Sequence, residues 1–205
     1  MYRQRLDALA AVWEQWADVG SALTDVEWST PSRCAGWDVA ALFAHVGMFQ
    51  QAVLDPPQAD GGDPVTAVDI LRGFNEPSGV AHALADQVAD IAVAVAAQVG
   101  RPGLVALFAD TGPRGIAALS DRPADGLVPW PGAGAVTTWV EAVRIVLLES
   151  TVHLLDVLRG LGRAPQVPAE ALRDTAHLLA DLADPVALVE AATGRSSASP
   201  LPVVR

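Results

Sequence analysis

The sequence contains very little cysteine: among its 205 residues, Cys34 is the only one. A single cysteine excludes an intramolecular disulfide, and nothing in the sequence points to an oxidising compartment. The N-terminus turns at once into a charged amphipathic pattern, which differs from that of a signal peptide. The apolar run from Ile91 to Val99 is too short to span a bilayer. We therefore expect a cytoplasmic protein with no membrane partner.

Basic residues are also scarce. The chain has 13 Lys and Arg against 24 Asp and Glu, which gives a formal net charge of −11. Such a surface repels phosphate backbones, so we expect no nucleic-acid partner. The sequence also lacks a His-Glu-x-x-His pair, a Gly-rich phosphate loop and a Gly-x-Ser-x-Gly elbow. These absences argue against the common zinc-protease, nucleotide-binding and serine-hydrolase classes.

Hydrophobic residues make up 51% of the chain, mostly alanine, leucine and valine, which favour helices. Their spacing predicts helices over residues 3–23, 38–54, 65–74, 78–99, 103–119, 137–161, 168–183 and 185–193. Loops rich in Gly, Pro or Asp are expected at 28–37, 55–64 and 120–135, and an extended tail at 196–205. Long helices with long connections predict an all-α fold, a four-helix bundle over residues 1–163. A short C-terminal helical extension and tail would then occupy residues 164–205.

The helix predicted at 137–161 carries three polar residues among apolar ones. At about 100° per residue, Glu149, His153 and Asp156 fall within one narrow sector. Ile145 and Val146 flank the same sector, so we expect the polar trio to face the core. Burying an unpaired carboxylate is costly, and no lysine lies nearby in sequence to pair with it.

A divalent metal ion would resolve this conflict. Glu149 and His153 lie one helical turn apart and can reach the same ion, and His45, in the middle of the helix at 38–54, is the best third ligand. Three protein ligands leave one position open, as in catalytic zinc sites. Zinc is favoured, although nickel, iron and manganese also accept such ligands. We interpret Asp156 either as a residue that hydrogen-bonds to a metal ligand or as a hydrogen-bond partner of bound substrate.

Other interpretations of these residues stay open. A Glu-x-x-x-His pair on a helix is commonly an ordinary polar pair, and a lone histidine such as His45 is commonly a packed core residue. We interpret His82 and His177, which lie in alanine-rich predicted helices, as surface or packing residues. Cys34 follows Arg33 in a loop and is interpreted as a small packed residue rather than a nucleophile.

Two segments resemble a known family. Residues 28–46 contain a tryptophan, a proline and a Cys-x-Gly-Trp turn, from Cys34 to Trp37, ahead of a helix with His45. Residues 144–160 contain the pattern Glu-x-x-x-His-x-x-Asp. Together they resemble the DinB-like superfamily, in its branch of mycothiol-dependent maleylpyruvate isomerase N-terminal domains. The resemblance covers roughly residues 1–163.

The resemblance implies a four-helix bundle with a zinc-type site, whose ligands would be His45, Glu149 and His153. It also implies a small thiol cosubstrate, such as mycothiol or bacillithiol. The characterised isomerase carries a further C-terminal domain that supplies a catalytic arginine. Only about forty residues follow the bundle here, and Arg195 in that tail does not map onto that arginine.

We therefore expect a metal-dependent enzyme that uses a low-molecular-weight thiol for transfer to, or isomerisation of, a small electrophilic substrate. A cation stabilises a thiolate, and the thiolate is the nucleophile. Two alternatives are a metal-dependent hydrolase of a small amide or ester, and a non-catalytic metal-binding stress-response module. A homodimer formed through the apolar first helix also stays open.

Overall fold

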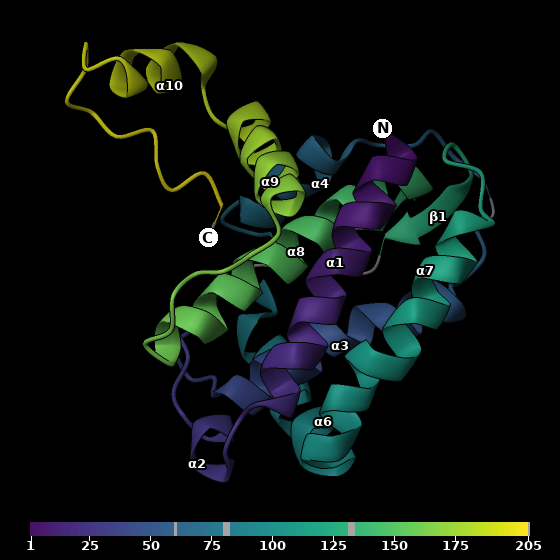
Figure 1. Cartoon of the computed structure of the whole chain (residues 1–205). Helices are drawn as coiled ribbons and strands as arrows, with labels where there is room; N and C mark the ends of the chain where they lie inside the picture. The colour runs from purple at the N-terminus through teal and green to yellow at the C-terminus, as the bar shows by residue number, and fades with distance from the viewer. Residues whose placement is uncertain (60, 80–82, 131–133, 205) are drawn as a thin grey trace.

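The computed structural model describes residues 1–59, 61–79, 83–130 and 134–204, and helices dominate it (Figure 1). The helical elements are α1 Tyr2–Ser21, α2 Asp25–Trp28, α3 Val39–Leu54, α4 Ala67–Asn75, α6 Ala85–Ala106, the π-helical η1 Leu107–Thr111, α7 Gly112–Ser120, α8 Trp139–Gly160, α9 Ala169–Leu182 and α10 Pro185–Ala192. Two short strands, β1 Leu127–Trp130 and β2 Ala135–Thr138, form the sheet found in these ranges. The predicted all-α helical bundle is confirmed.

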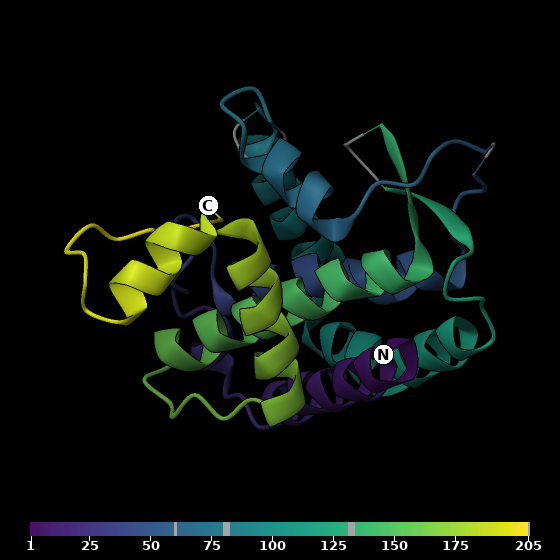
Figure 2. The same ribbon diagram turned by 90° about the horizontal axis from the view of Figure 1, so that it is seen from above.

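Helices α1, α3 and α8 form the bundle together with the run from α6 to α7, as Figures 1 and 2 show from two directions. The centre of the core is aromatic. The ring of Trp16 packs edge-on against Phe43 at 4.7 Å and stacks on Phe108 at 5.0 Å. The indole nitrogens of Trp13 and Trp16 donate to the side chain and the carbonyl of Ser150, at 3.0 and 2.9 Å. These bonds fix α1 against α8, the helix with the polar trio.

The start of α3 follows a local rule of helix capping. The side chain of Asp38 accepts a hydrogen bond of 2.8 Å from the backbone N–H of Ala41, which would otherwise lack a partner. The helix ends at Leu54, just before Pro56 and Pro57, which cannot continue it. The predicted bounds of this helix are therefore confirmed, and the cap sets the position of His45 two turns along.

The region predicted as a loop at 120–135 differs from the expectation. β1 and β2 pair antiparallel, with Val128 opposite Thr137. The Thr137 hydroxyl donates to the carbonyl of Val65 at 2.7 Å, and the Val65 N–H donates to the carbonyl of Val136 at 2.9 Å. These hydrogen bonds to a distant segment stabilise the extended backbone of the strands, in a region whose Gly and Pro content had predicted a loop.

The predicted break between 99 and 103 is a kink. Gly100 adopts a positive φ of 69°, which favours glycine, and Pro102 follows it within the run of α6. Beyond the kink the chain continues through η1 into α7. His82 lies outside the described residues, whereas His177 is exposed on α9, as predicted.

Helix α2 was not predicted. A capping box starts it: Thr24 accepts from the backbone N–H of Glu27, and Glu27 accepts from that of Thr24. Arg163, just beyond α8, donates to Glu27 at 2.6 Å. The Thr24 hydrogen bonds, with a smaller contribution from Arg163, lower the pKa of Glu27 to about 2.

This lowered pKa predicts a pH-dependent contribution to stability. Glu27 stabilises the fold above its unfolded pKa of about 4.3, and this contribution is lost as the pH falls toward 2. We expect Glu27→Gln to lower the melting temperature near neutral pH. The difference in melting temperature from wild type should shrink as the pH approaches 3. Thermal unfolding between pH 7 and 3 measures this, with the exposed Glu190→Gln as the matched control. A gap to wild type that stays constant across this range would contradict the prediction.

The C-terminal segment begins with α9, which packs on α8 and α1. The buried guanidinium of Arg5 pairs with Asp174 of α9 at 3.1 Å. Helix α10 extends away from the bundle in Figure 1 and leaves Val186 and Val189 exposed. The division of the chain at residues 163 and 164 stays a prediction.

One stretch is long and apolar enough to cross a membrane, by length and composition only. It runs over Ala85–Ser120. Its most apolar 18-residue segment has a mean hydropathy of 1.7, and 22% of that segment is buried in the structure. This stretch includes α6, which packs against α3 and α1 in the bundle. The expectation that the protein has no membrane partner therefore stays a prediction.

Candidate metal centre

Helices α3 and α8 bring together the three residues predicted as metal ligands. Nε2 of His45 lies 3.7 Å from Oε2 of Glu149, and Nε2 of His153 lies 3.3 Å from the same oxygen. One ligand atom from each of the three residues lies within 4.8 Å of the others. The two imidazole side chains are each 16% exposed, and the carboxylate is 24% exposed.

The position of this cluster differs in one respect from the expectation. Glu149 is only partly buried, although its neighbours Leu148 and Ser150 are buried. The α8 sector with the polar trio therefore meets α3 at the margin of the core rather than in its centre. A partly exposed cluster can hold charge at lower cost and remains accessible to small molecules.

The two imidazoles counteract the burial of Glu149. Burial alone would raise the pKa of this carboxyl, but hydrogen bonds and charges from His153 and His45 hold the pKa below its ordinary value. Burial would likewise lower the pKa of His153, yet hydrogen bonds to Asp156, Cys34 and Glu149 raise it well above 6.5. The site thus stabilises positive charge between its carboxylates.

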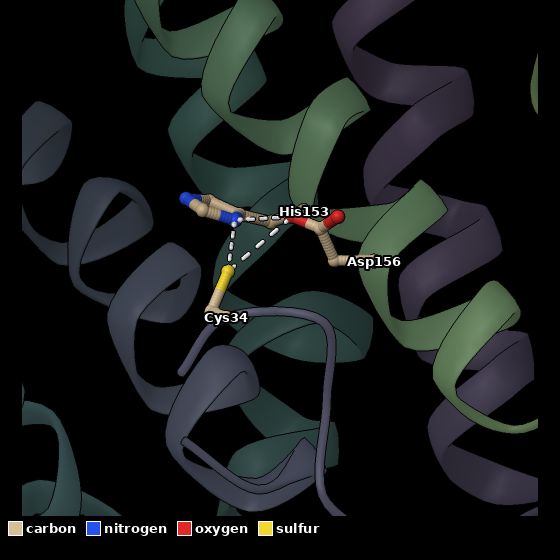
Figure 3. Close-up of side chains that lie close together, drawn as sticks. All are labelled: Cys34, His153 and Asp156. Carbon is tan, nitrogen blue, oxygen red and sulfur yellow. Dashed lines mark hydrogen bonds and ion pairs between the residues drawn. The ribbon is translucent and has the colours of Figure 1, made fainter. Parts of the chain in front are cut away.

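Asp156 and Cys34 lie beside Nδ1 of His153, as Figure 3 shows. Nδ1 of His153 is 3.2 Å from Oδ2 of Asp156, and the Cys34 thiol donates to the same oxygen at 3.4 Å. Sγ of Cys34 is 3.8 Å from that nitrogen. Burial would raise the pKa of Asp156, but contacts with His153, Cys34 and Arg33 lower it. Cys34 is partly packed against the core, and in addition it takes part in this polar cluster.

Sequence reasoning missed Trp37 as a residue of the site. Its ring lies 4.9 Å from the ring of His45 and 6.2 Å from that of His153. Phe49 lies on another side of His45, at 5.9 Å. The available signal was the position of Trp37 at the end of the Cys-x-Gly-Trp turn, directly before the helix with His45.

The loop with Cys34 and Trp37 is shaped by local bonds and by the end of α8. The N–H of Ser32 donates to the carbonyl of Trp37 at 2.9 Å, and Gly36 has a positive φ of 82°. A Cβ on Gly160 would lie 3.2 Å from both the carbonyl oxygen of Pro31 and the Cα of Ser32. The loop therefore rests directly on the backbone of α8, one turn beyond Asp156.

The donor set fits a zinc-type ion. Tetrahedral zinc with nitrogen and oxygen ligands separates neighbouring ligand atoms by about 3.4 Å. The separations of 3.7 and 3.3 Å between the two Nε2 atoms and Oε2 of Glu149 agree with this value. Three ligands of this kind leave a position open for a further group.

Comparisons with known proteins identify the family and the fold of the chain. The family model for the mycothiol maleylpyruvate isomerase N-terminal domain matches residues 9–158. Crystal structures of the mycothiol-dependent maleylpyruvate isomerase and of a histidine-to-alanine mutant share the fold, each with a TM-score of 0.59 and 15% identity. Each match covers 92% of this chain and 72% of the other. No curated protein matches the chain. Since the family model spans most of the sequence, the chain belongs to the mycothiol maleylpyruvate isomerase N-terminal domain family.

Proposed function

We propose that this protein is a metal-dependent enzyme that uses a low-molecular-weight thiol, such as mycothiol, for transfer to or isomerisation of a small electrophilic substrate. The observation that carries the proposal is the convergence of His45, Glu149 and His153 on one point, with their ligand atoms within 4.8 Å of one another. Membership of a family defined by a mycothiol-dependent isomerase supports the thiol as cosubstrate.

His45, Glu149 and His153 would hold the ion, with zinc favoured and nickel, iron or manganese also accepted by such ligands. When bound, a divalent ion supplies positive charge that favours the thiolate form of a thiol at the open position. The Glu149 carboxylate partly neutralises this charge. Asp156 accepts a hydrogen bond from Nδ1 of His153, which leaves the Nε2 lone pair free for the ion. The rings of Trp37 and Phe49 give the site an apolar side next to His45.

The test compares zinc-loaded protein with and without mycothiol, using maleylpyruvate and a panel of small electrophiles. We expect conversion that requires the thiol, measured as isomerised product or as a thiol conjugate by mass spectrometry. His45→Ala should abolish it, because only two ligands would remain. Turnover of an amide or ester without thiol would instead favour the hydrolase alternative. A zinc-loaded protein that neither binds thiol nor converts any substrate would leave the non-catalytic module as the better interpretation.

Asp156→Asn tests the role of the residue behind His153. The amide keeps the shape of the side chain but loses the charge that orients and polarises the imidazole. Loss of such a partner typically lowers metal affinity by about 10–100-fold. Competition with a chromophoric chelator for the ion held by His45 and Glu149 measures this affinity. Affinity equal to that of wild type would show that Asp156 does not support His153 in this way.

A further inference from the structure

His153 takes part in two clusters, one through each ring nitrogen. Its Nε2 faces Glu149 in the site described above. Its Nδ1 faces Asp156 and Cys34, which come from α8 and from the loop before α3 (Figure 3). Nothing in the proposed reaction uses the thiol of Cys34.

The second cluster has the dimensions of a metal site. The pairwise distances among Sγ of Cys34, Nδ1 of His153 and Oδ2 of Asp156 are 3.8, 3.4 and 3.2 Å. Tetrahedral zinc with one sulfur and two lighter ligands separates those ligand atoms by about 3.4–3.6 Å. All three residues are partly buried, so they are ordered by the fold yet accessible to an ion.

The two oxygens of Asp156 have different partners. Oδ1 lies 3.8 Å from Nε of Arg33, whereas Oδ2 faces the thiol and the imidazole. The Arg33 side chain is 60% exposed, so it can move away from an added cation at little cost. Oδ2 is thus the oxygen available to an ion in the second cluster.

We propose that Cys34, Asp156 and Nδ1 of His153 form a second binding site for a thiophilic divalent ion such as zinc, with the imidazole of His153 bridging the two sites. The ion takes the place of the proton that Nδ1 shares with Asp156. That proton and the thiol proton of Cys34 pass to solvent, as thiolate ligation requires. The negative charges of Glu149, Asp156, the thiolate and the bridging imidazolate then equal the positive charge of two divalent ions. A thiolate also suits zinc and other soft ions better than magnesium or calcium.

Cobalt titration of the intact protein in thiol-free buffer tests the second site. Because Cys34 is the only cysteine in the sequence, any sulfur-to-cobalt charge-transfer band in the near ultraviolet must come from it. We expect wild type to develop this band and to bind about two ions per chain. Cys34→Ser keeps a hydrogen-bonding group beside Asp156 but removes the sulfur. It should lose the band and bind about one ion.

His45→Ala separates this proposal from the proposed function. It removes a ligand of the first site only, so the sulfur-to-cobalt band should persist in it while thiol-dependent conversion is lost. No band in wild type at saturating cobalt, or equal stoichiometry in wild type and Cys34→Ser, would overturn the second site. A band that disappears in His45→Ala would also overturn it, because Cys34 would then be ligating the ion of the first site. The band and the stoichiometry, which decide on the second site, are measured without enzymatic turnover.

Discussion

Glu149→Gln is expected to weaken zinc binding at the site shared with His45 by more than about 100-fold, since loss of even an outer hydrogen-bond partner costs about 10–100-fold. Glu149 supplies the anionic ligand of that site, and its Oε2 lies within 3.7 Å of both Nε2 atoms. Glutamine keeps the volume but places a neutral amide between two imidazoles. Calorimetric zinc titration of tag-free protein, together with elemental analysis, measures the effect.

The control for this variant is Glu190→Gln, an exposed glutamate on α10 far along the chain from the site. It removes the same charge and should leave zinc affinity unchanged. The sulfur-to-cobalt band of Cys34 should also survive in Glu149→Gln, since Glu149 is not part of the second cluster. Wild-type zinc affinity in Glu149→Gln would remove the basis for the metal centre.

Trp16→Ala is expected to cause a large loss of stability. The indole is fully buried, contacts Phe43 and Phe108, and donates to the carbonyl of Ser150. Truncating a buried tryptophan to alanine typically costs about 3–5 kcal/mol through lost burial and the cavity left behind. Domains of this kind are stable by about 5–15 kcal/mol in total, so this cost is a large share.

Urea unfolding followed by circular dichroism measures the loss. Val186→Ala is the control, because Val186 is 65% exposed on α10 and should change stability by less than about 0.5 kcal/mol. A Trp16→Ala variant with the unfolding midpoint of wild type would mean that the aromatic centre is not the main source of stability.

The α8 part of the site could be predicted from the sequence because helical periodicity is a local property. The spacing of Glu149, His153 and Asp156 places them on one side of any helix, whatever surrounds it. The pairing of His45 with that helix came from ligand chemistry and from the family resemblance, and the structure brings His45 beside Glu149.

Other features depend on contacts between distant residues, which no local pattern specifies. Cys34 and Asp156 are 122 positions apart in the chain, so their contact required the folded structure. The strands β1 and β2 were not predicted because Pro129 and the nearby glycines are typical of loops. The hydrogen bonds to Val65 that stabilise the extended backbone come from a segment far away in the sequence. Helix α2 is too short for periodicity to detect, although its capping residues were visible in the sequence.

The close approach at Gly160 allows a substitution there to alter the site without changing any of its functional groups. A methyl group there would crowd Pro31 and Ser32, so the loop would have to move by a few tenths of an ångström. Cys34 and Trp37 belong to that loop and would move with it, while the side chains on α8 would stay in place. A substitution at this one small position would therefore change the spacing between the Cys34 thiol and Asp156 without touching either residue.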